Sequence, residues 1–304
     1  MTPGHNWEAQ TDRHDNAILL KDYETGIMAG SVHRRAGSLK PIAPTPHRFG
    51  VGRQVSKDTW IGTSGWSYEG WKGPFYPNEV PKQDWLCWYA SQFQTTEING
   101  SFYRTPSLAA VRSWRMSTPR EFIFAWKASK FITHWKRLND SCANSIALMA
   151  TRLEVLGPKL GAVLFQLPGN FEYNYERLAR FMVMLPTRYR YAFEFRHPSW
   201  YNKSVLDLLA VHDVSLCLAD HHLAPAPWIV TARHVYVRGH GPDGRYRDNY
   251  PRATLRTWAR HIRHWQRDGR LVFVYFDNDQ KSAAPSDALR LAELLQISAV
   301  SSGQ

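Results

Sequence analysis

The sequence predicts an α/β protein in which eight parallel strands close into a (β/α)8 barrel of the TIM type. Short apolar segments rich in β-branched and aromatic residues alternate with longer helical patterns, and this alternation is typical of parallel strands joined by helices. Eight such units occupy roughly 240 residues, which is the usual length of this barrel. An open, doubly wound sheet is the alternative, but it needs a GxGxxG loop after its first strand, and Ser64-Gly65-Trp66 does not supply one.

The first 57 residues differ from the remainder of the chain. They lack sustained hydrophobic periodicity, and the segment 41–46, with the sequence PIAPTP, is a proline-rich connector. We therefore expect a largely irregular, flexible N-terminal extension over residues 1–57 and a barrel domain over residues 58–304.

Four strands and four helices are predicted in the first half of the barrel. The strands lie at 60–63, 95–99, 122–127 and 162–168, and the helices lie at 81–93, 106–117, 140–156 and 172–185. Pro81 and Pro106 suit the first turn of a helix, and Gly157 followed by Pro158 ends one. The segments 100–105 and 128–139 are expected to be loops.

The second half of the barrel begins with a segment that is predicted to be a strand followed by a loop, residues 191–200. Further strands are predicted at 214–220, 234–240 and 271–276, and helices at 199–212, 251–268 and 286–295. Side chains alternate between the two faces of a strand. We therefore expect the first strand to pack Tyr191, Phe193 and Phe195 under helices. Its interior face would then carry Ala192, Glu194 and Arg196.

Polar residues recur where the predicted strands end, although the same strands begin with apolar residues. Seven of the eight strands end in this way, and the chemistry of such barrels takes place at the carboxyl ends of the strands. The residues are Glu97 and Asn99, Lys127, Gln166, Glu194, Arg196 and His197, Asp220 with His221 and His222, Arg238 and His240, and Asn278. We favour Asn278 over Asp277 as the inward residue. The recurrence predicts a functional pocket at this rim.

Charged residues at the rim suggest general acid–base chemistry. We expect Glu97, Glu194, Asp220 and Lys127 to be catalytic, and Arg196 and Arg238 to hold negative charge. The other candidates for substrate binding are Trp66, Asn99, Tyr103, His134, Gln166, His197, His240 and Asn278. Structural alternatives are open: Glu194 and Arg196 could form an ion pair, and Lys127 could neutralise a carboxylate. The glycine-rich loop 238–246 could bind phosphate or form a plain turn.

Composition favours an anionic substrate. The net charge of +12 suits phosphates, sugar acids or nucleic acid, although we favour a solvated basic surface over a dedicated nucleic-acid face. We expect a hydrolase or isomerase that acts on a small phosphorylated or carbohydrate-like anion. One alternative is metal-assisted phosphodiester hydrolysis with Glu97, Glu194, Asp220 and His240 as ligands, which the neighbouring cations disfavour. The other is nucleic-acid binding through stacked aromatic rings and arginines. No motif for an organic cofactor is present.

The cysteines and the apolar segments indicate the cellular compartment of the protein. Cys87, Cys142 and Cys217 form no CxxC pair, which is typical of reduced thiols, and Cys217 lies in an apolar strand. No run approaches the ~20 apolar residues that span a membrane, and the N-terminus lacks the pattern of a secretory signal. We expect a cytoplasmic protein with no membrane partner.

Several ordered motifs resemble one known family. They are Ile61-Gly62-Thr63-Ser64-Gly65-Trp66, Glu97-Ile98-Asn99 with Phe102-Tyr103 and Pro106, Thr133-His134, Leu156-Gly157-Pro158 with Gln166-Leu167-Pro168, Glu194-Phe195-Arg196-His197 with Trp200, Arg238 with His240-Gly241, and Phe276-Asp277-Asn278-Asp279. Over about residues 58–296 they resemble the YecE-like family, known as domain of unknown function 72. The resemblance implies a TIM-type barrel of unsettled activity. Asp277 stands where the resemblance leads us to expect asparagine.

Overall fold

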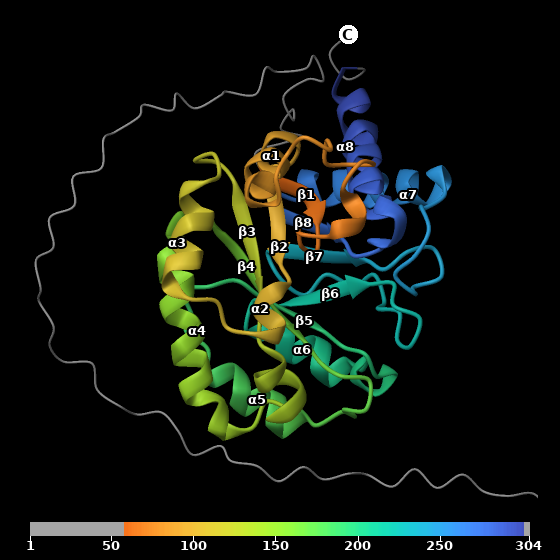
Figure 1. The fold of residues 1–304 in the computed structure, drawn as a ribbon. Coiled ribbons are helices and arrows are strands. Elements are labelled where there is room, and N and C mark those ends of the chain that lie inside the picture. Colours follow the sequence, from red (N-terminus) through yellow and green to blue (C-terminus); the bar gives the residue numbers. More distant parts are fainter. Residues whose placement is uncertain (1–57, 301–304) are drawn as a thin grey trace, which may run out of the picture. The chain divides into compact units, whose positions relative to one another are not determined.

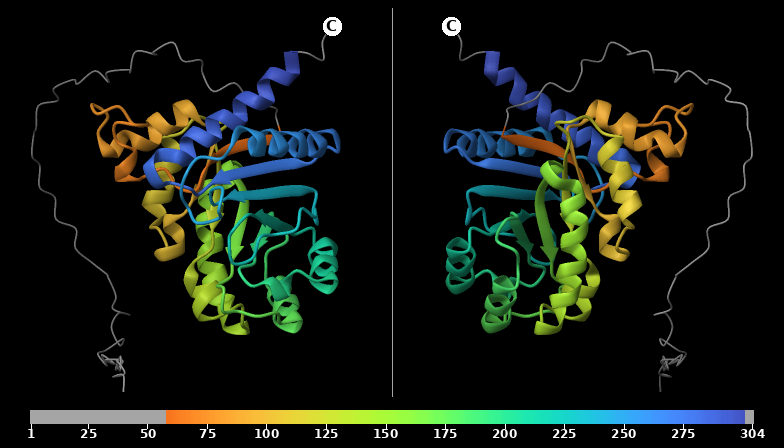
Figure 2. Two further views of the ribbon diagram at one scale, coloured as in Figure 1. Left: turned by 90° about the vertical axis from the view of Figure 1, so that its right-hand side faces the viewer. Right: turned by 90° about the vertical axis from the view of Figure 1, so that its left-hand side faces the viewer.

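A computed structural model describes residues 58–300 of the chain, with side chains to residue 295. The predicted extension over residues 1–57 lies outside the described residues. Within residues 58–300, the chain alternates strands and helices as the sequence predicts, and the helices cover the outside of the sheet (Figures 1 and 2).

Eight parallel strands form one sheet in the order β1-β8-β7-β6-β5-β4-β3-β2. Their bounds are β1 Thr59–Thr63, β2 Thr95–Ile98, β3 Ile123–Lys127, β4 Leu160–Gln166, β5 Tyr191–Glu194, β6 Ser215–Ala219, β7 His234–Gly239 and β8 Leu271–Phe276. The two ends of the sheet meet through a parallel bridge between Ser64 and Glu97, and Gly65 N donates to Glu97 O at 2.8 Å. The sheet is therefore nearly closed into a barrel, which confirms the predicted fold over the open alternative.

The helices follow the strands closely in the predicted order. They are α1 Trp85–Gln92, α2 Gly100–Tyr103, α3 Leu108–Met116, α4 Ala143–Leu156, α5 Tyr175–Val183, α6 Lys203–Val211, α7 Arg252–Arg267 and α8 Ala283–Val300. A proline-rich connection without a helix joins β6 to β7. Gly157, with φ of 56°, ends α4 as predicted, because glycine adopts this left-handed conformation without steric cost.

The structure differs from the sequence prediction in three helical segments. Residues 100–105 contain the single-turn helix α2, and residues 128–139 contain a five-residue π-helix, Phe131–Trp135. Both segments were expected to be loops because one turn is too short to show periodicity. Helix α8 extends beyond the predicted 286–295 at both ends, since the first and last turns of a helix are the part that a sequence pattern defines least.

The two faces of the strands carry different side chains, and this difference determines which residues point toward the site. Small and aromatic side chains fill the barrel interior, including Ala125, Ala192 and Cys217, which confirms Cys217 as a core residue. On the outside, Phe193 packs edge-on against Phe181 of α5, and Phe195 stacks on Trp200 at 4.9 Å. The predicted alternation along β5 is confirmed, so Glu194 and Arg196 lie on the interior face above a packed apolar layer.

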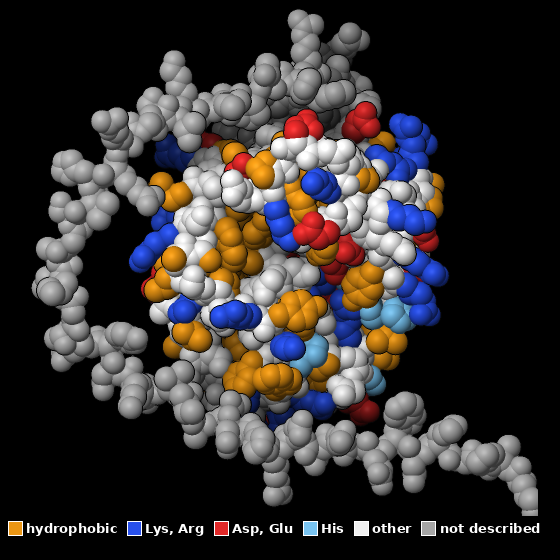
Figure 3. Space-filling view, viewed as in Figure 1, with side chains coloured by type: hydrophobic (Ala, Val, Ile, Leu, Met, Phe, Trp, Pro, Cys, Tyr) orange, Lys and Arg blue, Asp and Glu red, His pale blue; other side chains and the backbone are white. Residues whose placement is uncertain are grey.

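Helix α7 is amphipathic, as its sequence predicts. Its buried stripe includes Leu255, Trp258, Ile262 and Trp265, while basic side chains are numerous on the outer side of this helix (Figure 3). The three cysteines are free thiols, and no helix of the described part is apolar enough over sufficient length to span a membrane.

Candidate functional site

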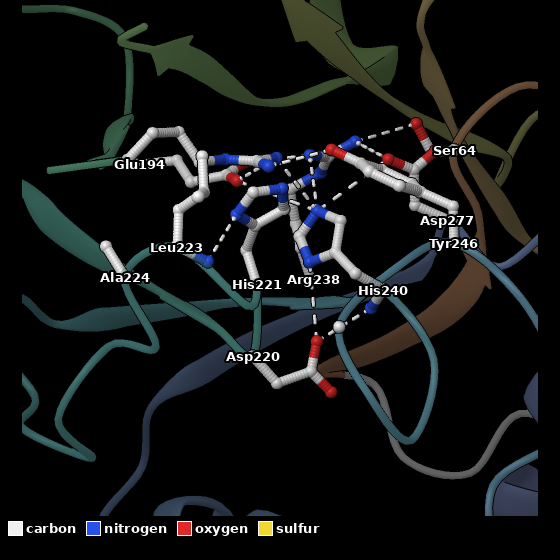
Figure 4. A network of polar contacts seen from close by, with 12 residues as sticks. Ser64, Glu194, Asp220, His221, Leu223, Ala224, Arg238, His240, Tyr246 and Asp277 are labelled. Atoms are coloured by element: carbon white, nitrogen blue, oxygen red, sulfur yellow. Dashed lines mark hydrogen bonds and ion pairs between the residues drawn. The ribbon is translucent and has the colours of Figure 1, made fainter. Parts of the chain in front are cut away.

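The Arg238 guanidinium, at the end of β7, connects the ends of four other strands. It is fully buried and donates from Nη1 to Glu194 Oε2 at 2.8 Å. Its Nη2 donates to Glu97 Oε1 at 2.9 Å and to Asp277 Oδ2 at 2.9 Å. Nη2 also lies 3.0 Å from Ser64 Oγ, just after β1. Side chains that are far apart in the sequence thus converge on one network at the carboxyl ends of the strands (Figure 4).

Glu194 is held between two guanidinium groups. Its Oε2 accepts from Arg238, and its Oε1 is ion-paired with Arg196. Burial alone would raise the pKa of Glu194, but Arg196, Arg238 and Lys127 outweigh it and lower the pKa to about 2. The carboxylate is therefore ionised at neutral pH and poorly suited to donate a proton, and this geometry supports the ion-pair interpretation of Glu194 and Arg196.

Glu97 has hydrogen-bond donors at both of its carboxylate oxygens. Oε1 accepts from Ser64 Oγ at 2.5 Å as well as from Arg238, and Oε2 accepts from Tyr236 O–H at 2.7 Å. The side chain is completely buried. The hydrogen bonds from Ser64, Tyr236 and Arg238 therefore fix the position of the Glu97 carboxylate.

His240 is a neutral imidazole between the two arginines and Asp220. Its Nε2 accepts from Arg196 Nη2 at 3.0 Å and from Arg238 Nη1 at 3.1 Å. Burial, then Arg196 and Arg238, lower the pKa of His240 well below its usual range. Because Nε2 accepts, the ring proton is on Nδ1, which lies 3.3 Å from Asp220 Oδ1.

Asp220 lies at the edge of the network, where it accepts from the His240 backbone N–H at 2.7 Å and from Tyr250 O–H. Burial raises the pKa of Asp220 to about 6, although these hydrogen bonds lower it. Asp220 therefore titrates closer to neutral pH than an ordinary carboxyl group does.

Lys127, the last residue of β3, is a buried amine without a hydrogen bond or ion pair to any residue between 58 and 295. Its side chain is 5% exposed, and Nζ lies 4.5 Å from the centre of the Phe102 ring. Burial, then the charge of Arg238, lower the pKa of Lys127 to about 8, against the opposing influence of Glu97, Asp277 and Glu194.

The prediction that Asn278 rather than Asp277 faces the interior is wrong. Phe273 and Tyr275 lie on the interior face of β8, and the alternation continues to Asp277, which accepts from Arg238. Asn278 instead donates from Nδ2 to Asp248 O at 2.7 Å and to Asp287 Oδ2 at 2.9 Å. It supports the loop that follows β7 and the start of α8.

Three other sequence candidates lie outside the network. Trp66 packs edge-on against Trp114 at 5.4 Å. Tyr103 is 67% exposed, with Lys130 over its ring. His197 caps a short 3-10 helix, where its Nδ1 lies 2.7 Å from Ser199 Oγ. These contacts are structural or peripheral.

Three further candidates lie beside the network. Asn99 Nδ2 lies 3.5 Å from the hydroxyl of Tyr68, which donates to Ser64 O at 2.6 Å. His134 packs edge-on against Phe102, the ring that also contacts Lys127, with 5.1 Å between centroids. Gln166 is half-buried and pairs in register with Glu194. They border the region between Lys127 and the arginines.

Sequence reasoning missed several members of the network. Ser64 and Asp277 hold Arg238, Tyr236 holds Glu97, and Tyr246 accepts a 2.7 Å hydrogen bond from Arg196 Nη1. Alternation along β7 could have identified Tyr236, since it lies two residues before Arg238 on the same face. Tyr246 lies in an irregular loop, where no period indicates the direction of a side chain.

Hydrogen bonds within the segment 240–250 shape the loop after β7. The amides of Gly244 and Tyr246 donate to Gly241 O and His240 O, and the Gly241 amide donates to Tyr250 Oη at 2.8 Å. The Arg247 guanidinium donates to Asp243 at 2.7 Å. Because these groups already have partners within the loop, the geometry supports the plain turn over a phosphate-binding loop.

Buried N–H groups in the network have no hydrogen-bond acceptor in the described part of the chain. They are Nε of Arg196 and Nε of Arg238, together with a third buried N–H, the protonated Nδ1 of His240; the buried Oδ1 of Asn99 also has no donor there. Buried donors of this kind require oxygen partners, so the network suits an oxygen-rich ligand. Residues 58–295 contain no group of three or more His, Cys, Asp or Glu side chains that could hold a metal ion. The four residues considered as metal ligands, Glu97, Glu194, Asp220 and His240, therefore do not form such a group.

A cavity of about 270 Å³ lies on the other side of β3. It is lined by Trp126, Ser101 and Met149 among others. Trp126 points away from the barrel interior because it alternates with Lys127. The cavity is thus separate from the charged network.

Comparisons with known proteins place the chain among relatives of the same fold. The family described as "Protein of unknown function DUF72" matches residues 60–303. UPF0759 protein YunF of Bacillus subtilis (strain 168) is 27% identical over 274 residues, 78% of this chain and 95% of that protein. UPF0759 protein YecE of Escherichia coli (strain K12) is 32% identical over 116 residues, 38% of this chain and 42% of that protein.

Solved structures support the same conclusion. The crystal structure of a DUF72 family protein from Thermotoga maritima MSB8 has a TM-score of 0.72 and 28% identity, covering 78% of this chain and 99% of that chain. A DUF72 family protein from Enterococcus faecalis V583 has a TM-score of 0.68 at 20% identity, covering 78% and 95%, and is similar in fold. The resemblance found in the sequence is confirmed.

Proposed function

This chain belongs to the DUF72 family of proteins of unknown function, and we propose that it is an acid–base enzyme, a hydrolase or isomerase, for a small phosphorylated or carbohydrate-like anion. The reaction takes place at the carboxyl ends of the barrel strands. One observation carries the proposal: Lys127 is a buried amine without a polar partner among residues 58–295, it lies beside a network of ion pairs, and its pKa is about 8.

The roles within the network follow from which groups change protonation near neutral pH. Glu97 and Glu194 are held by hydrogen bonds and ion pairs, so they position the arginines, and the lowered pKa of Glu194 keeps that carboxylate ionised. Lys127 transfers the proton, and Asp220, with a pKa of about 6, is a second candidate at the edge of the site. Glu194 is therefore proposed as a positioning residue.

An anionic or hydroxyl-rich substrate suits the donors of the site. Nε of Arg196 and Nε of Arg238 are buried without acceptors in the described residues, and a phosphate or sugar oxygen could accept from them. The net charge of +12 adds a favourable field for an anion approaching the barrel.

The test is turnover of a panel of sugar phosphates, followed by ¹H and ³¹P NMR. Wild type and the control Lys203→Arg should convert the same compound, because Lys203 is an exposed partner of Asp207. Lys127→Arg should be slower by about 10²–10⁴-fold, since arginine does not release its proton near neutral pH. A rate for Lys127→Arg equal to that of wild type would contradict the proposal.

Nucleic-acid binding is a second candidate, favoured by exposed aromatic side chains near the rim. Tyr103 and Trp135 are 67% and 68% exposed, and Lys130 Nζ lies 5.6 and 5.5 Å from their ring centres. Exposed rings beside cations can stack bases and contact phosphates.

A gel-shift titration with a single-stranded oligonucleotide at increasing salt tests the second candidate. Binding that weakens steeply with salt, and that falls about tenfold or more in Trp135→Ala, would favour it. The double variant of Arg256 and Arg260 to serine is the control for unspecific attraction to the arginine face of α7. Unchanged affinity in Trp135→Ala would exclude the stacking surface.

A further inference from the structure

We infer that Lys127 is a nucleophile that captures the carbonyl group of an anionic aldehyde or ketone as an imine. This inference rests on the proposed function, because it uses the same amine and the same rim. It adds the class of substrate, a phosphorylated or carboxylated carbonyl compound, and the covalent step.

The backbone of Lys127 is held by hydrogen bonds, whereas its amine has no hydrogen bond or ion pair among the described residues. Its backbone carbonyl accepts from Ser101 Oγ at 2.6 Å, and the next amide, Ala128 N, donates to Leu164 O at 2.8 Å. The side chain rests against the Phe102 ring. The backbone at Lys127 is thus fixed, and burial together with the Phe102 ring confines the side chain, as attack on a bound carbonyl requires.

The carboxylates nearest to Lys127 are all bound to other groups. Glu97 is bound to Ser64, Tyr236 and Arg238, and Glu194 and Asp277 are bound to guanidinium groups. No carboxylate oxygen of the described residues lies within 4.0 Å of Lys127 Nζ. A direct ion pair would keep the amine protonated, whereas this amine can lose its proton and react.

Lys159 shows how a structural buried lysine differs. Its side chain is 7% exposed, comparable to Lys127, but Nζ donates to Arg115 O at 2.6 Å, to Thr118 O at 2.8 Å and to Thr118 Oγ1 at 2.9 Å. All three donor positions of Lys159 are therefore used. Burial alone does not explain why the Lys127 amine lacks hydrogen bonds to the described residues, because Lys159 is similarly buried and has three. A free amine is what a reactive lysine needs.

The covalent step balances without an added redox partner. The lone pair of the neutral amine attacks the carbonyl carbon, the C=O π electrons move to the oxygen, and a first proton passes from the nitrogen to that oxygen. The carbinolamine hydroxyl then leaves as water with the second proton of the nitrogen, while the nitrogen lone pair forms C=N. Arg196 Nε and Arg238 Nε are the unused donors that could hold the anionic group or the developing oxygen.

The test is reductive trapping of the whole protein with pyridoxal 5′-phosphate and borohydride, followed by peptide mass spectrometry. Borohydride adds hydride to the imine carbon and converts the adduct to a stable secondary amine. We expect the peptide of Lys127 to be labelled at concentrations at least tenfold lower than those of Lys203 and Lys159. Pyridoxine 5′-phosphate, which has an alcohol in place of the aldehyde, should protect Lys127. The rate of labelling should rise with pH and level off above pH about 8, the pKa of Lys127.

The outcomes separate the inference from the function on which it rests. If pyridoxine 5′-phosphate binds, by isothermal titration calorimetry, but Lys127 is not labelled ahead of Lys203, the imine is refuted and the acid–base proposal stands. If neither phosphate compound binds, the anion site and the imine both fail. Lys127→Arg, checked for folding by circular dichroism, should bind pyridoxine 5′-phosphate and show no label at position 127; loss of label from other lysines in that variant would also contradict the inference.

Discussion

At the scale of single residues, the protein separates fixed charges from a charge that can change. Arg238 is surrounded by Glu194, Glu97 and Asp277, and its ion pairs hold these three carboxylates in position. Lys127 is close enough to be influenced by them but is bound to none. Chemistry that needs proton transfer at neutral pH would therefore use the amine, while the ion pairs maintain the shape of the site.

Glu194→Gln should destabilise the fold strongly. The variant leaves Arg238 and Arg196 buried with one fewer carboxylate, and breaking a buried pair in this way costs about 3–5 kcal/mol. Urea unfolding measures the loss. Glu154→Gln is the matched control, because Glu154 forms an exposed pair with Arg188, and its midpoint should stay near that of wild type. Equal midpoints for both variants would show that the buried pair carries no stability.

The same ion pair predicts the response of stability to acid. Because the pKa of Glu194 is lowered to about 2 in the folded protein, its contribution is fully present above the unfolded pKa of about 4.5. The contribution should decline as the pH falls from there to 2. Urea midpoints of wild type and Glu194→Gln should therefore converge over this window; a constant gap would contradict the assigned pKa.

Residue identity was predicted better than residue orientation. The sequence indicated Glu97, Lys127, Glu194 and Arg238 because charged residues at the ends of apolar strands are costly unless they are used. It did not show that Asp277 points inward. Two neighbouring polar residues, Asp277 and Asn278, follow β8, and which of them faces the interior depends on how far the alternation of the strand continues. The sequence also could not show that Arg238 saturates the carboxylates, since that depends on distances across the barrel.

At the scale of elements, the junction of β1 and β2 closes the barrel. Gly62 of β1 lies so close to β2 that a Cβ atom there would come within 2.2 Å of Thr95 O. Only glycine permits this approach. The junction also brings Ser64 to Glu97, so the closure of the barrel and the geometry of the site are connected.

Gly62→Ala should therefore lower the stability by about 1–3 kcal/mol, because the added methyl group forces the two strands apart. Thermal unfolding measures the effect. Gly70→Ala is the control, since a Cβ at that position meets no atom within 4 Å. If both variants melt at the same temperature, the close approach at Gly62 is not required for the fold.

Long, periodic elements were predictable and single turns were not. The apolar stripe of α7 and the alternation along β3 and β5 each repeat enough times to identify the buried face. The π-helix Phe131–Trp135 does not, and it ends where Arg137 and Leu138 adopt φ of 47° and 61°. That backbone depends on tertiary contacts, which no local pattern contains.

At the scale of the whole molecule, eight parallel strands bring residues from distant parts of the chain to one rim. Ser64 and Arg238, separated by 174 positions, are in hydrogen-bonding contact. The sequence predicted this convergence from the fold alone, because parallel strands in a barrel place their carboxyl ends together. The identity of the substrate depends on contacts between protein and ligand. The hydrogen-bond donors of the site therefore indicate only its chemical class.

Lys127 is the amine that loses its proton near neutral pH, beside carboxylates that Arg238 holds in position. The most direct measurement is an NMR titration of protein labelled with ¹⁵N at the lysine Nζ, with the signal assigned by its loss in Lys127→Arg. We predict that the Lys127 signal titrates with a pKa of about 8 while exposed lysines titrate near 10.5. A Lys127 signal that titrates together with the exposed lysines would contradict the account.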